Sequence, residues 1–467
     1  MFKKFIIVVF LFSVSLVFSA PPELPSIFSD HMVLQRQMKV PIWGKADAGA
    51  TVTVEFAGQK KSVTACDAGN WRVDLDAMEA SAESRIMTVT AGENKIEFAD
   101  VLVGEVWLCS GQSNMGWNLV KAEEADEFLP KSGNPLFRFY RAPMGSAETP
   151  LPRIDAEWVV YSPETGGTSS AVAYFFGRKL QEDLNVPVGL WQSAYGGATI
   201  DSFIPPQGFK TVESIKHLAD TPSLTGNSVA DRKLPSLNYN FMLHANIPFA
   251  IRGVIWYQGE ANHTEGILYY DKTIAQLNSW RALWGYEFPF YFVQLPPYMY
   301  GKDDPEILPQ FWEACETIVK NIPNTGKIII SDVTTLDNIH PPKKLIPGER
   351  LALLAEAKTY NMNVTYSGPV FEQMKISGNS IIILFKFADG LTTRDGNAPD
   401  WFEIAGADGE FKTATAKITG NTVVLTSTEV TAPAAARLGW HKLATPNLMN
   451  AAGIPAAPFN TARELWK

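Results

Sequence analysis

Between residues 101 and 361 the sequence alternates short, strongly apolar runs with longer amphipathic ones. Apolar runs typical of buried strands cover 101–109, 186–197, 250–262, 289–298 and 326–340. Apolar residues recur at helical spacing over 169–184, 269–285, 308–322 and 348–361. A helix that follows a strand carries the chain back to begin the next strand in the same direction. This alternation therefore predicts a layered α/β domain with a mostly parallel sheet.

Polar clusters follow four of these apolar runs. They read SGQSN from Ser110, AYGGAT from Ala194, YQGEAN from Tyr257 and DNIHP from Asp337. Each cluster comes just past the carboxyl end of a predicted strand. Ligands of open α/β sheets bind at that edge, so the four clusters predict a single site there.

The segments on either side have β character. From Leu24 to about Asp100, and again from about Tyr366, short runs of alternating or β-branched residues end at Gly, Asn or Asp. A chain of 467 residues is also too long for one ordinary core. We therefore predict an N-terminal β domain over 21–100, a three-layer α/β domain over 101–362 and a C-terminal β domain over 363–467. Both flanking domains are expected to be accessory and sandwich-like.

Residues 1–20 have the pattern of a secretory leader. Lys3 and Lys4 precede an apolar stretch from Phe5 to Leu16, and Ser19 and Ala20 supply small residues for cleavage. The apolar stretch is short for a membrane span. The pattern predicts export to the periplasm or the extracellular space, with no membrane span in the mature chain.

Charge and cysteine content exclude several classes of partner. The chain has 40 basic and 49 acidic residues, a net charge of −9, and loss of Lys3 and Lys4 with the leader would make it about −11. It has no long run of Lys or Arg, which argues against nucleic acid and anionic membranes as partners. The three cysteines suit neither a disulfide scaffold nor a zinc site. Neutral or weakly charged ligands fit better.

Ser113 is the first candidate for chemistry. It follows Gly111 at the predicted start of a helix, where backbone N–H groups and the helix dipole favour a nucleophile. The G-x-S-x-G elbow of common α/β-hydrolases would need glycine where this chain has Met115. A serine in this position can also be an ordinary helix cap. A catalytic role therefore requires a base and donors for the oxyanion.

His340 is the best candidate for the base. The chain has six histidines, and only His340 combines a loop after a strand with a carboxylate three residues earlier, Asp337. That spacing can bring the carboxylate to the imidazole, where it would hold the tautomer and stabilise the imidazolium.

The other two clusters supply candidate oxyanion donors. Gly196 and Gly197 suit a turn whose backbone N–H groups point into the site, although they also suit an ordinary tight turn. The side-chain amide of Gln258 or of Asn262 could donate to an oxyanion. Glu260 could contact the histidine, bind substrate or cap a helix. Each cluster is weak evidence alone, and the set is much stronger.

The motifs GQSNM, YGGATI, WYQGEAN and DNIHP closely resemble the four sequence blocks of the SGNH-type carbohydrate esterases. The sialate O-acetylesterases are the most similar group, and acetylxylan esterases share related motifs. FSDHMVLQR, VPIWGKA and NLMNAAGIPAAPF extend the resemblance to sialate O-acetylesterases outside the site.

The resemblance implies an SGNH-hydrolase-like fold and a role for each site residue. Ser113 would be the nucleophile, His340 the base and Asp337 its orienter. The oxyanion would be held by the Ser113 backbone N–H, by a backbone N–H of Gly196 or Gly197, and by the Gln258 side chain. The second block reads YGGA where relatives often have GGT. In some relatives the Glu of QGE helps to orient the histidine, so Glu260 is an alternative to Asp337.

The sequence therefore predicts an exported serine esterase that removes O-acetyl groups from sugars, with sialic acid as the leading substrate. A serine esterase of this kind is expected to need no cofactor or metal. An acetylesterase for xylan or another plant polysaccharide is the first alternative, and a non-catalytic glycan-binding protein is the second. Arg or Lys near Ser113 would favour the anionic sialic acid, whereas a neutral aromatic cleft would favour xylan. The sequence does not indicate an oligomeric state.

Overall fold

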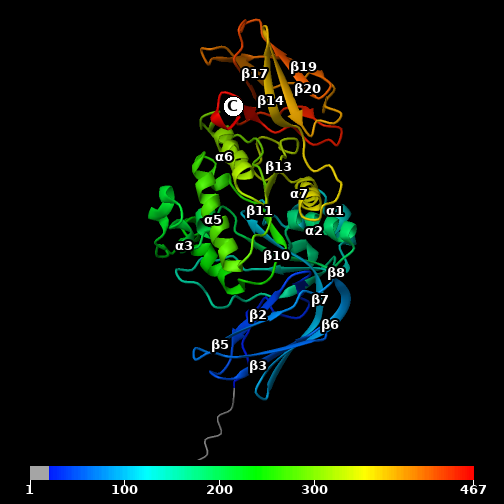
Figure 1. Cartoon of the computed structure of the whole chain (residues 1–467), viewed down its shortest axis with the longest axis vertical. Coiled ribbons are helices and arrows are strands. Elements are labelled where there is room, and N and C mark those ends of the chain that lie inside the picture. The colour runs from blue at the N-terminus through cyan, green and yellow to red at the C-terminus, as the bar shows by residue number, and fades with distance from the viewer. Residues whose placement is uncertain (1–19, 467) are drawn as a thin grey trace, which may run out of the picture.

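A mostly parallel sheet forms the centre of the computed structural model, which describes residues 20–466 (Figure 1). The predicted leader, apart from Ala20, lies outside the described residues. The strand order is β13-β12-β11-β7-β10-β8-β9, and only β9 at one edge runs antiparallel to its neighbour. The strands are β7 (Asn94–Gly111), β8 (Asn134–Arg141), β9 (Trp158–Tyr161), β10 (Val188–Ala194), β11 (Gly253–Tyr257), β12 (Phe290–Val293) and β13 (Thr325–Ile328).

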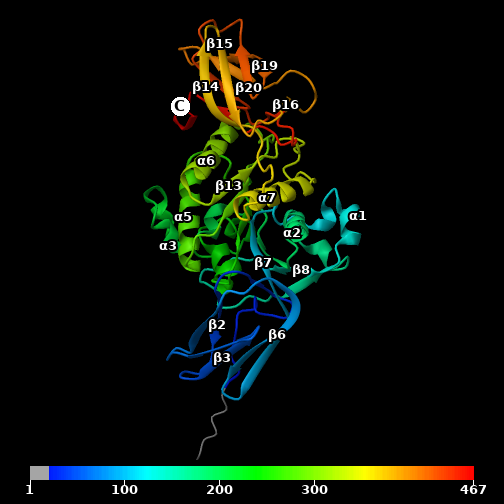
Figure 2. The ribbon, with the colours of Figure 1, turned by 45° about the vertical axis from the view of Figure 1, so that its right-hand side comes forward.

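Helices cover both faces of this sheet. The helix pair α2 (Ala171–Leu184) and α7 (Leu345–Lys358) packs on one side, and α5 (Leu268–Trp284) with α6 (Ile307–Asn321) packs on the other (Figure 2). The short helices are α1 (Ala125–Phe128), α3 (Pro206–Phe209), α4 (Ser228–Asp231), η1 (Leu119–Lys121), η2 (Leu129–Lys131), η3 (Gly166–Thr168), η4 (Ile200–Phe203), η5 (Glu213–Leu218), η6 (Tyr239–Leu243), η7 (His244–Asn246), η8 (Glu260–Asn262) and η9 (Glu464–Trp466). The predicted three-layer α/β architecture is confirmed.

The N-terminal β segment is continuous with the central sheet. The strand β7 is 18 residues long, and its first half pairs with β6 before its second half pairs with β10 and β11. The other strands here are β1 (Val33–Gln35), β2 (Val40–Lys45), β3 (Thr51–Phe56), β4 (Gln59–Thr64), β5 (Asn70–Leu75) and β6 (Ser81–Ala91). One buried core runs through both parts, from Ile42 and Val54 to Trp107 and Leu190.

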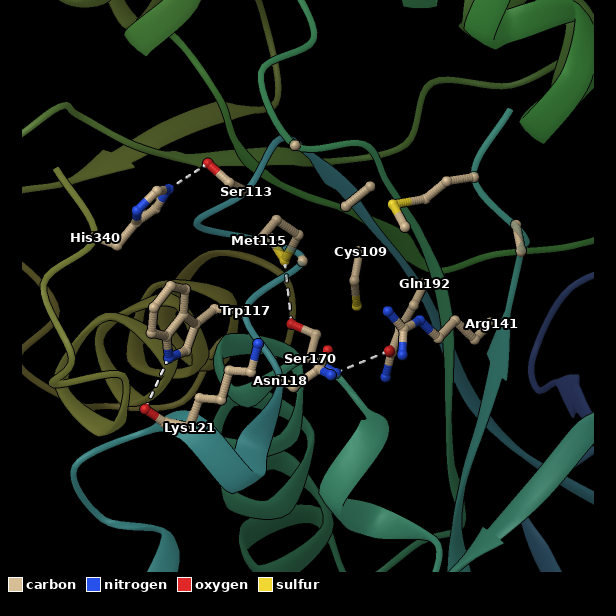
Figure 3. Close-up of a pocket in the computed structure, with 15 residues that line it drawn as sticks. Cys109, Ser113, Met115, Trp117, Asn118, Lys121, Arg141, Ser170, Gln192 and His340 are labelled. Atoms are coloured by element: carbon tan, nitrogen blue, oxygen red, sulfur yellow. Dashed lines mark hydrogen bonds between the residues drawn. The ribbon is translucent and has the colours of Figure 1, made fainter. Parts of the chain in front are cut away.

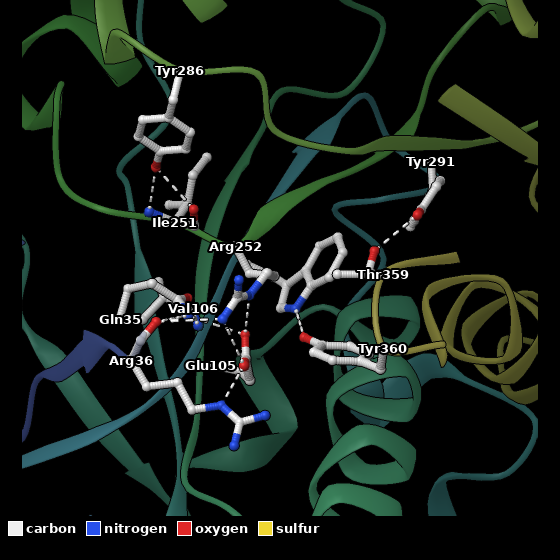
Figure 4. A network of polar contacts seen from close by, with 11 residues as sticks. Gln35, Arg36, Glu105, Val106, Ile251, Arg252, Tyr286, Tyr291, Thr359 and Tyr360 are labelled. Atoms are coloured by element: carbon white, nitrogen blue, oxygen red, sulfur yellow. Dashed lines mark hydrogen bonds and ion pairs between the residues drawn. The ribbon is translucent and has the colours of Figure 1, made fainter. Parts of the chain in front are cut away.

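A buried ion cluster lies where the two parts join (Figure 4). Glu105 on β7 is fully buried, and its carboxylate binds the guanidinium groups of Arg36, at 2.5 Å, and Arg252, at 2.9 Å. The Gln35 amide also donates to Glu105 at 3.1 Å and accepts from the Val106 N–H at 2.8 Å. A buried carboxylate held by two guanidinium groups fixes the N-terminal segment against β7 and β11.

The C-terminal β segment has a separate buried core. Its first sheet has the order β14-β15-β20-β19, its second β18-β17-β21-β23, and β16 pairs with β22. The strands are β14 (Val370–Ser377), β15 (Ser380–Lys386), β16 (Thr392–Thr393), β17 (Phe402–Ala405), β18 (Phe411–Thr413), β19 (Thr415–Thr419), β20 (Thr422–Thr426), β21 (Ala435–Leu438), β22 (Leu448–Met449) and β23 (Phe459–Asn460). Ile383, Leu425 and Phe459 lie in its core. Accessory β structure at both ends of the chain is therefore confirmed.

Two features differ from the sequence analysis. The strands β8 and β9 were not anticipated, because β8 carries Arg138 and Arg141 among its aromatic residues. The predicted boundary between residues 100 and 101 falls inside β7, so the division into three domains stays a prediction.

Within residues 20–466 no helix is long and apolar enough to cross a membrane.

Candidate active site

Three of the four polar clusters begin at the same level of the central sheet. The last residues of β10 and β11, Ala194 and Tyr257, are both in register with Gly111 at the end of β7. Parallel strands that end together bring the residues that follow them to one edge. The fourth cluster, which contains His340, lies on the loop between β13 and α7.

The structure brings Ser113 and His340 into direct contact. His340 Nε2 lies 2.7 Å from Ser113 Oγ (Figure 3). The imidazole stacks on Trp117 at a centroid distance of 5.2 Å, and the His340 backbone N–H donates to Asn338 Oδ1 at 2.9 Å. Burial, followed by the nearby Lys344 charge, lowers the pKa of His340. A neutral imidazole at this distance can accept the serine proton.

The backbone around Ser113 is held by a close approach to β11. Gly111 has φ +139°, and a Cβ there would lie 2.2 Å from the Tyr257 carbonyl oxygen, so only glycine fits. The Gln112 N–H donates to the same carbonyl at 3.0 Å. The predicted helix after Ser113 is wrong. A single turn forms, in which the Gly116 N–H donates to Gln112, because Gly116 and Asn118 are weak helix formers.

Gly196 lies against the nucleophile. A Cβ built on Gly196 would lie 3.5 Å from the Ser113 Cβ. Gly197 has φ +73°, and a Cβ there would lie 3.1 Å from the Arg232 guanidinium carbon. Among the hydrogen bonds within residues 20–466, none uses the backbone N–H of Ser113, Gly196 or Gly197. Backbone donors beside the nucleophile therefore remain available for an oxyanion.

Gln258 is not left free to act as such a donor. Its Nε2 donates to Asn262 Oδ1 at 2.6 Å, to the Ala198 carbonyl at 3.1 Å and to Gln112 Oε1 at 3.2 Å. Its Oε1 accepts from the Tyr269 hydroxyl at 2.9 Å. Because both amide protons have acceptors, the structure gives Gln258 a scaffolding position instead of the oxyanion position expected from the sequence.

Asn262 is also part of the scaffold. It is fully buried, and its Oδ1 accepts from the Ile200 N–H at 3.1 Å. Its Nδ2 donates to Asp201 at 3.2 Å and to Glu265 at 3.0 Å. Asn262 therefore connects the turn after β11 to the segment after β10, and both its amide oxygen and its amide nitrogen are engaged there.

A buried polar network lies behind the Ser113–His340 pair. Asn114 Nδ2 donates to Glu260 Oε1 and, at 2.9 Å, to the carbonyl of Ile339, the residue before His340. Asn114 Oδ1 accepts from Lys344 Nζ at 2.6 Å. Asn114 thus connects the turn of the nucleophile to the loop of the base. The sequence analysis missed Asn114 and Lys344 as site residues, since only the folded chain brings them together.

Burial shifts both charged members of this network toward their neutral forms. It raises the pKa of Glu260, against the opposing effects of the Asn114 hydrogen bond and the Lys344 charge. It lowers the pKa of Lys344 to about 7, although Glu260 and Glu124 act in the opposite direction. Glu260 Oε2 is buried and has no hydrogen-bond partner in the described part of the chain.

Neither predicted orienter touches the imidazole. Asp337 is exposed, and within the described residues it forms no hydrogen bond or ion pair with His340. Glu260 is buried, but it reaches the His340 loop only through Asn114. The ring is positioned in the structure by Trp117 and by the loop backbone.

Ser113 and His340 open into a cavity of about 310 Å³. Its wall contains two cationic side chains, Lys121 and Arg141, and no carboxylate. The lining residues are Cys109, Ser113, Met115, Gly116, Trp117, Asn118, Lys121, Arg141, Ala142, Met144, Ser170, Gln192, Ala194, Gly196 and His340. Within residues 20–466, no group of three or more His, Cys, Asp or Glu side chains is arranged to hold a metal ion.

Comparison with known proteins is consistent with this geometry. Residues 103–344 match the family model of a carbohydrate esterase described as a sialic acid-specific acetylesterase. The chain is 32% identical to the sialate O-acetylesterase of Homo sapiens over 75% of its length and 74% of the relative's. The corresponding enzyme of Rattus norvegicus is 29% identical, over 75% and 76%.

A solved structure is similar over nearly the whole chain. The carbohydrate acetylesterase from Xanthomonas citri is 34% identical, with a TM-score of 0.86, and the match covers 94% of this chain and 99% of that one. The similarity therefore includes both flanking β segments. The matched family segment contains Ser113 and His340.

Proposed function

Since the chain belongs to the sialic acid-specific acetylesterase family of carbohydrate esterases and is a carboxylic ester hydrolase, we propose that Ser113 and His340 remove O-acetyl groups from a sugar through an acetyl-enzyme. The family resemblance expected from the motifs is confirmed. The observation that carries the proposal is the 2.7 Å contact between Ser113 Oγ and His340 Nε2 at the wall of a cavity.

In the first half of the reaction Ser113 Oγ attacks the acetyl carbonyl carbon. His340 Nε2 accepts the hydroxyl proton as the new O–C bond forms, and the carbonyl oxygen gains the negative charge. The free backbone N–H groups of Ser113 and Gly196 are the donors for this oxyanion, with Gly197 beside them. When the intermediate collapses, the bond to the sugar oxygen breaks and His340 returns the proton to that oxygen.

In the second half water releases the acetyl group. His340 takes a proton from water as its oxygen attacks the acetyl carbon on Ser113, and the same donors hold the oxyanion. The bond to Ser113 Oγ then breaks, the serine regains a proton from His340, and acetate leaves. The lowered pKa of His340 favours the neutral base at the start of each half.

The proposal keeps both candidate orienters of His340. Glu260 would act through Asn114 and the Ile339 carbonyl, which fixes the loop that carries the base. Asp337 would have to move from its exposed position to reach the ring. We expect Asn114→Ala to lower kcat more than Asp337→Asn does, because Asn114 already bridges the nucleophile turn and the base loop.

The proposed substrate is an O-acetylated sialic acid. The two cationic residues and the lack of carboxylates in the cavity wall support an anionic sugar over a neutral one. Acetate release from mono-O-acetylated sialic acid and from acetylated xylan oligomers, measured side by side, tests this choice. A preference for xylan would overturn it.

Export is a separate part of the proposal. Lys3, Lys4 and the apolar stretch after them have the pattern of a leader, and cleavage near Ala20 would release the protein to the periplasm or the extracellular space. N-terminal sequencing of protein recovered outside the cytoplasm tests it. A chain that keeps Met1 there would contradict cleavage.

The central test is Ser113→Ala. It removes the nucleophile and should lower acetate release by about 1000-fold or more, because the histidine alone cannot form the acetyl-enzyme. A fluorophosphonate should label the wild type on Ser113 and fail to label the variant. A variant with near wild-type activity and an unchanged Tm would exclude this mechanism.

A further inference from the structure

Arg141 stands out among the residues that line the cavity. It is the last residue of β8, and its register partner on β10 is Gln192, so its backbone is fixed by the sheet. Figure 3 shows its guanidinium beside Gln192, on the side of the cavity away from His340. Ser113 and Arg141 therefore face one cavity from rigid parts of the fold.

The charge of Arg141 is not neutralised by the protein. Among residues 20–466 its side chain forms no ion pair, and its one side-chain hydrogen bond goes from Nη1 to the Thr168 carbonyl. Arg138, three residues earlier on the same strand, pairs with Asp100 at 2.9 Å. A guanidinium has five N–H donors, so most of those of Arg141 remain free.

Its setting makes this unpaired charge unusual. Arg141 is half-buried, and burial lowers its pKa with no opposing carboxylate, yet an arginine stays charged in proteins. Charged groups that lose water are normally paired. Within the described part of the chain, the only other charged side chain of the cavity wall is the exposed Lys121, although the net charge of the whole sequence is −9.

We propose that Arg141 binds the carboxylate of a sugar acid while Ser113 attacks an O-acetyl group on the same molecule. The planar guanidinium fork matches a carboxylate and can donate two parallel hydrogen bonds. Arg141 is thus the residue that separates acidic sugars from neutral ones. This inference rests on the proposed esterase function and assigns one residue to its specificity.

Esterifying the substrate carboxylate tests the contact directly. The substrates are mono-O-acetylated N-acetylneuraminic acid and its carboxyl methyl ester, and the readout is acetate, not methanol. We expect wild-type kcat/KM to favour the acid by roughly 10- to 100-fold, which is the range for hydrogen bonds to a charged group. In Arg141→Gln this ratio should fall to within about threefold of one.

The ratio makes the test independent of folding. A loss of folded enzyme lowers both rates equally and cancels, so a purely structural role through Thr168 would leave the ratio unchanged. Arg141→Lys keeps the charge without the fork and should retain an intermediate ratio. Lys121→Gln removes the other cationic side chain of the cavity wall, and we expect it to lower the ratio less than Arg141→Gln does, because Lys121 is exposed and its charge is screened by solvent.

Different failures have different meanings. A wild-type ratio near one, or an unchanged ratio in Arg141→Gln, overturns the assignment even if acetate is released from both substrates. A larger fall in Lys121→Gln than in Arg141→Gln also overturns it. If Ser113→Ala releases acetate as fast as wild type, the proposed function fails, and the carboxylate contact fails with it.

Discussion

The two flanking β segments are joined to the α/β part in different ways. The N-terminal segment shares the strand β7 and one continuous core with it, and Glu105 is buried between Arg36 and Arg252 at their junction. The C-terminal segment has its own core. It contacts the α/β part through the ion pair of Arg437 with Glu306, whose side chains are 14% and 43% exposed, and through the buried Lys442, which donates to the Tyr300 and Gly301 carbonyls. The comparison predicts that the first segment is structural support for the site and that the second is an attached module.

The course of β7 explains why this difference matters for the chemistry. The same strand that pairs with β6 at its start ends at Gly111, two residues before Ser113. We therefore expect a disturbance of the N-terminal segment to reach the nucleophile through this strand. No strand of the central sheet continues into the C-terminal segment.

The largest expected effect comes from Glu105→Gln. It leaves the guanidinium groups of Arg36 and Arg252 half-buried without their carboxylate, and breaking such a buried cluster costs about 3–5 kcal/mol. Thermal unfolding followed by tryptophan fluorescence should show a lower Tm, with acetate release lost over the same temperature range. A variant with wild-type Tm would contradict the view that the N-terminal segment is integral.

Two matched core substitutions give the next largest effect. Ile42 and Ile383 are both fully buried, one in each flanking segment, and truncation of either to alanine should cost about 2–5 kcal/mol. We expect Ile42→Ala to lower the transition at which activity is lost. Ile383→Ala should instead lower a separate transition, above which acetate release still persists.

Calorimetry with parallel activity measurements distinguishes the two variants. If Ile383→Ala lost activity at the same temperature as its first transition, the C-terminal segment would not be an independent module. That outcome would also contradict the predicted domain boundary near residue 363.

A substitution of Lys344 tests whether the buried network beside the nucleophile sets the pKa of the base, His340. Burial of the imidazole and, after it, the charge of Lys344 lower the pKa of His340, so the base stays neutral to lower pH than an ordinary histidine does. Lys344→Met removes the charge, and the pKa of His340 should rise toward the ordinary value of a histidine. Because His340 must be neutral to accept a proton, the acidic limb of kcat/KM should move to higher pH.

Lys343→Met is the matched control for this shift. Lys343 is the adjacent residue, half-exposed, and 3.9 Å from Glu123. Its removal should leave the acidic limb within about 0.2 pH units of wild type, because an exposed charge is screened by solvent. Equal shifts in both variants would show that net charge, and not the buried network, sets the pKa of His340.

Much of the fold was predictable because its patterns are local. The apolar run of β11 and the amphipathic run of α2 each signal their own structure. By contrast, β8 was missed because its Arg138 is compatible with a buried strand only when Asp100, from a distant strand, pairs with it. The predicted helix after Ser113 failed because Gly116 and Asn118 do not support more than one turn.

The site residues also differ in whether a local sequence pattern could identify them. Ser113, Gly196 and His340 follow strand ends in short motifs, so their proximity followed from the expected sheet. No local sequence pattern encodes the remaining site residues. The partners of Asn114 and Lys344 are distant in the chain. Arg141 is notable for the lack of an ion pair among the described residues. An amide such as Gln258 is ambiguous for the same reason, since its partners Ala198 and Tyr269 come from other elements.

The smallest expected effect is at the C-terminal junction. Glu306 is 43% exposed and binds Arg437 at 2.7 Å, while Arg437 keeps a second partner in Glu403. Glu306→Gln should therefore cost no more than about 1 kcal/mol and leave kcat/KM unchanged. Urea unfolding measures the first quantity and acetate release the second. A loss comparable to that of Glu105→Gln would mean that both segments are equally integral, and the contrast between them would no longer hold.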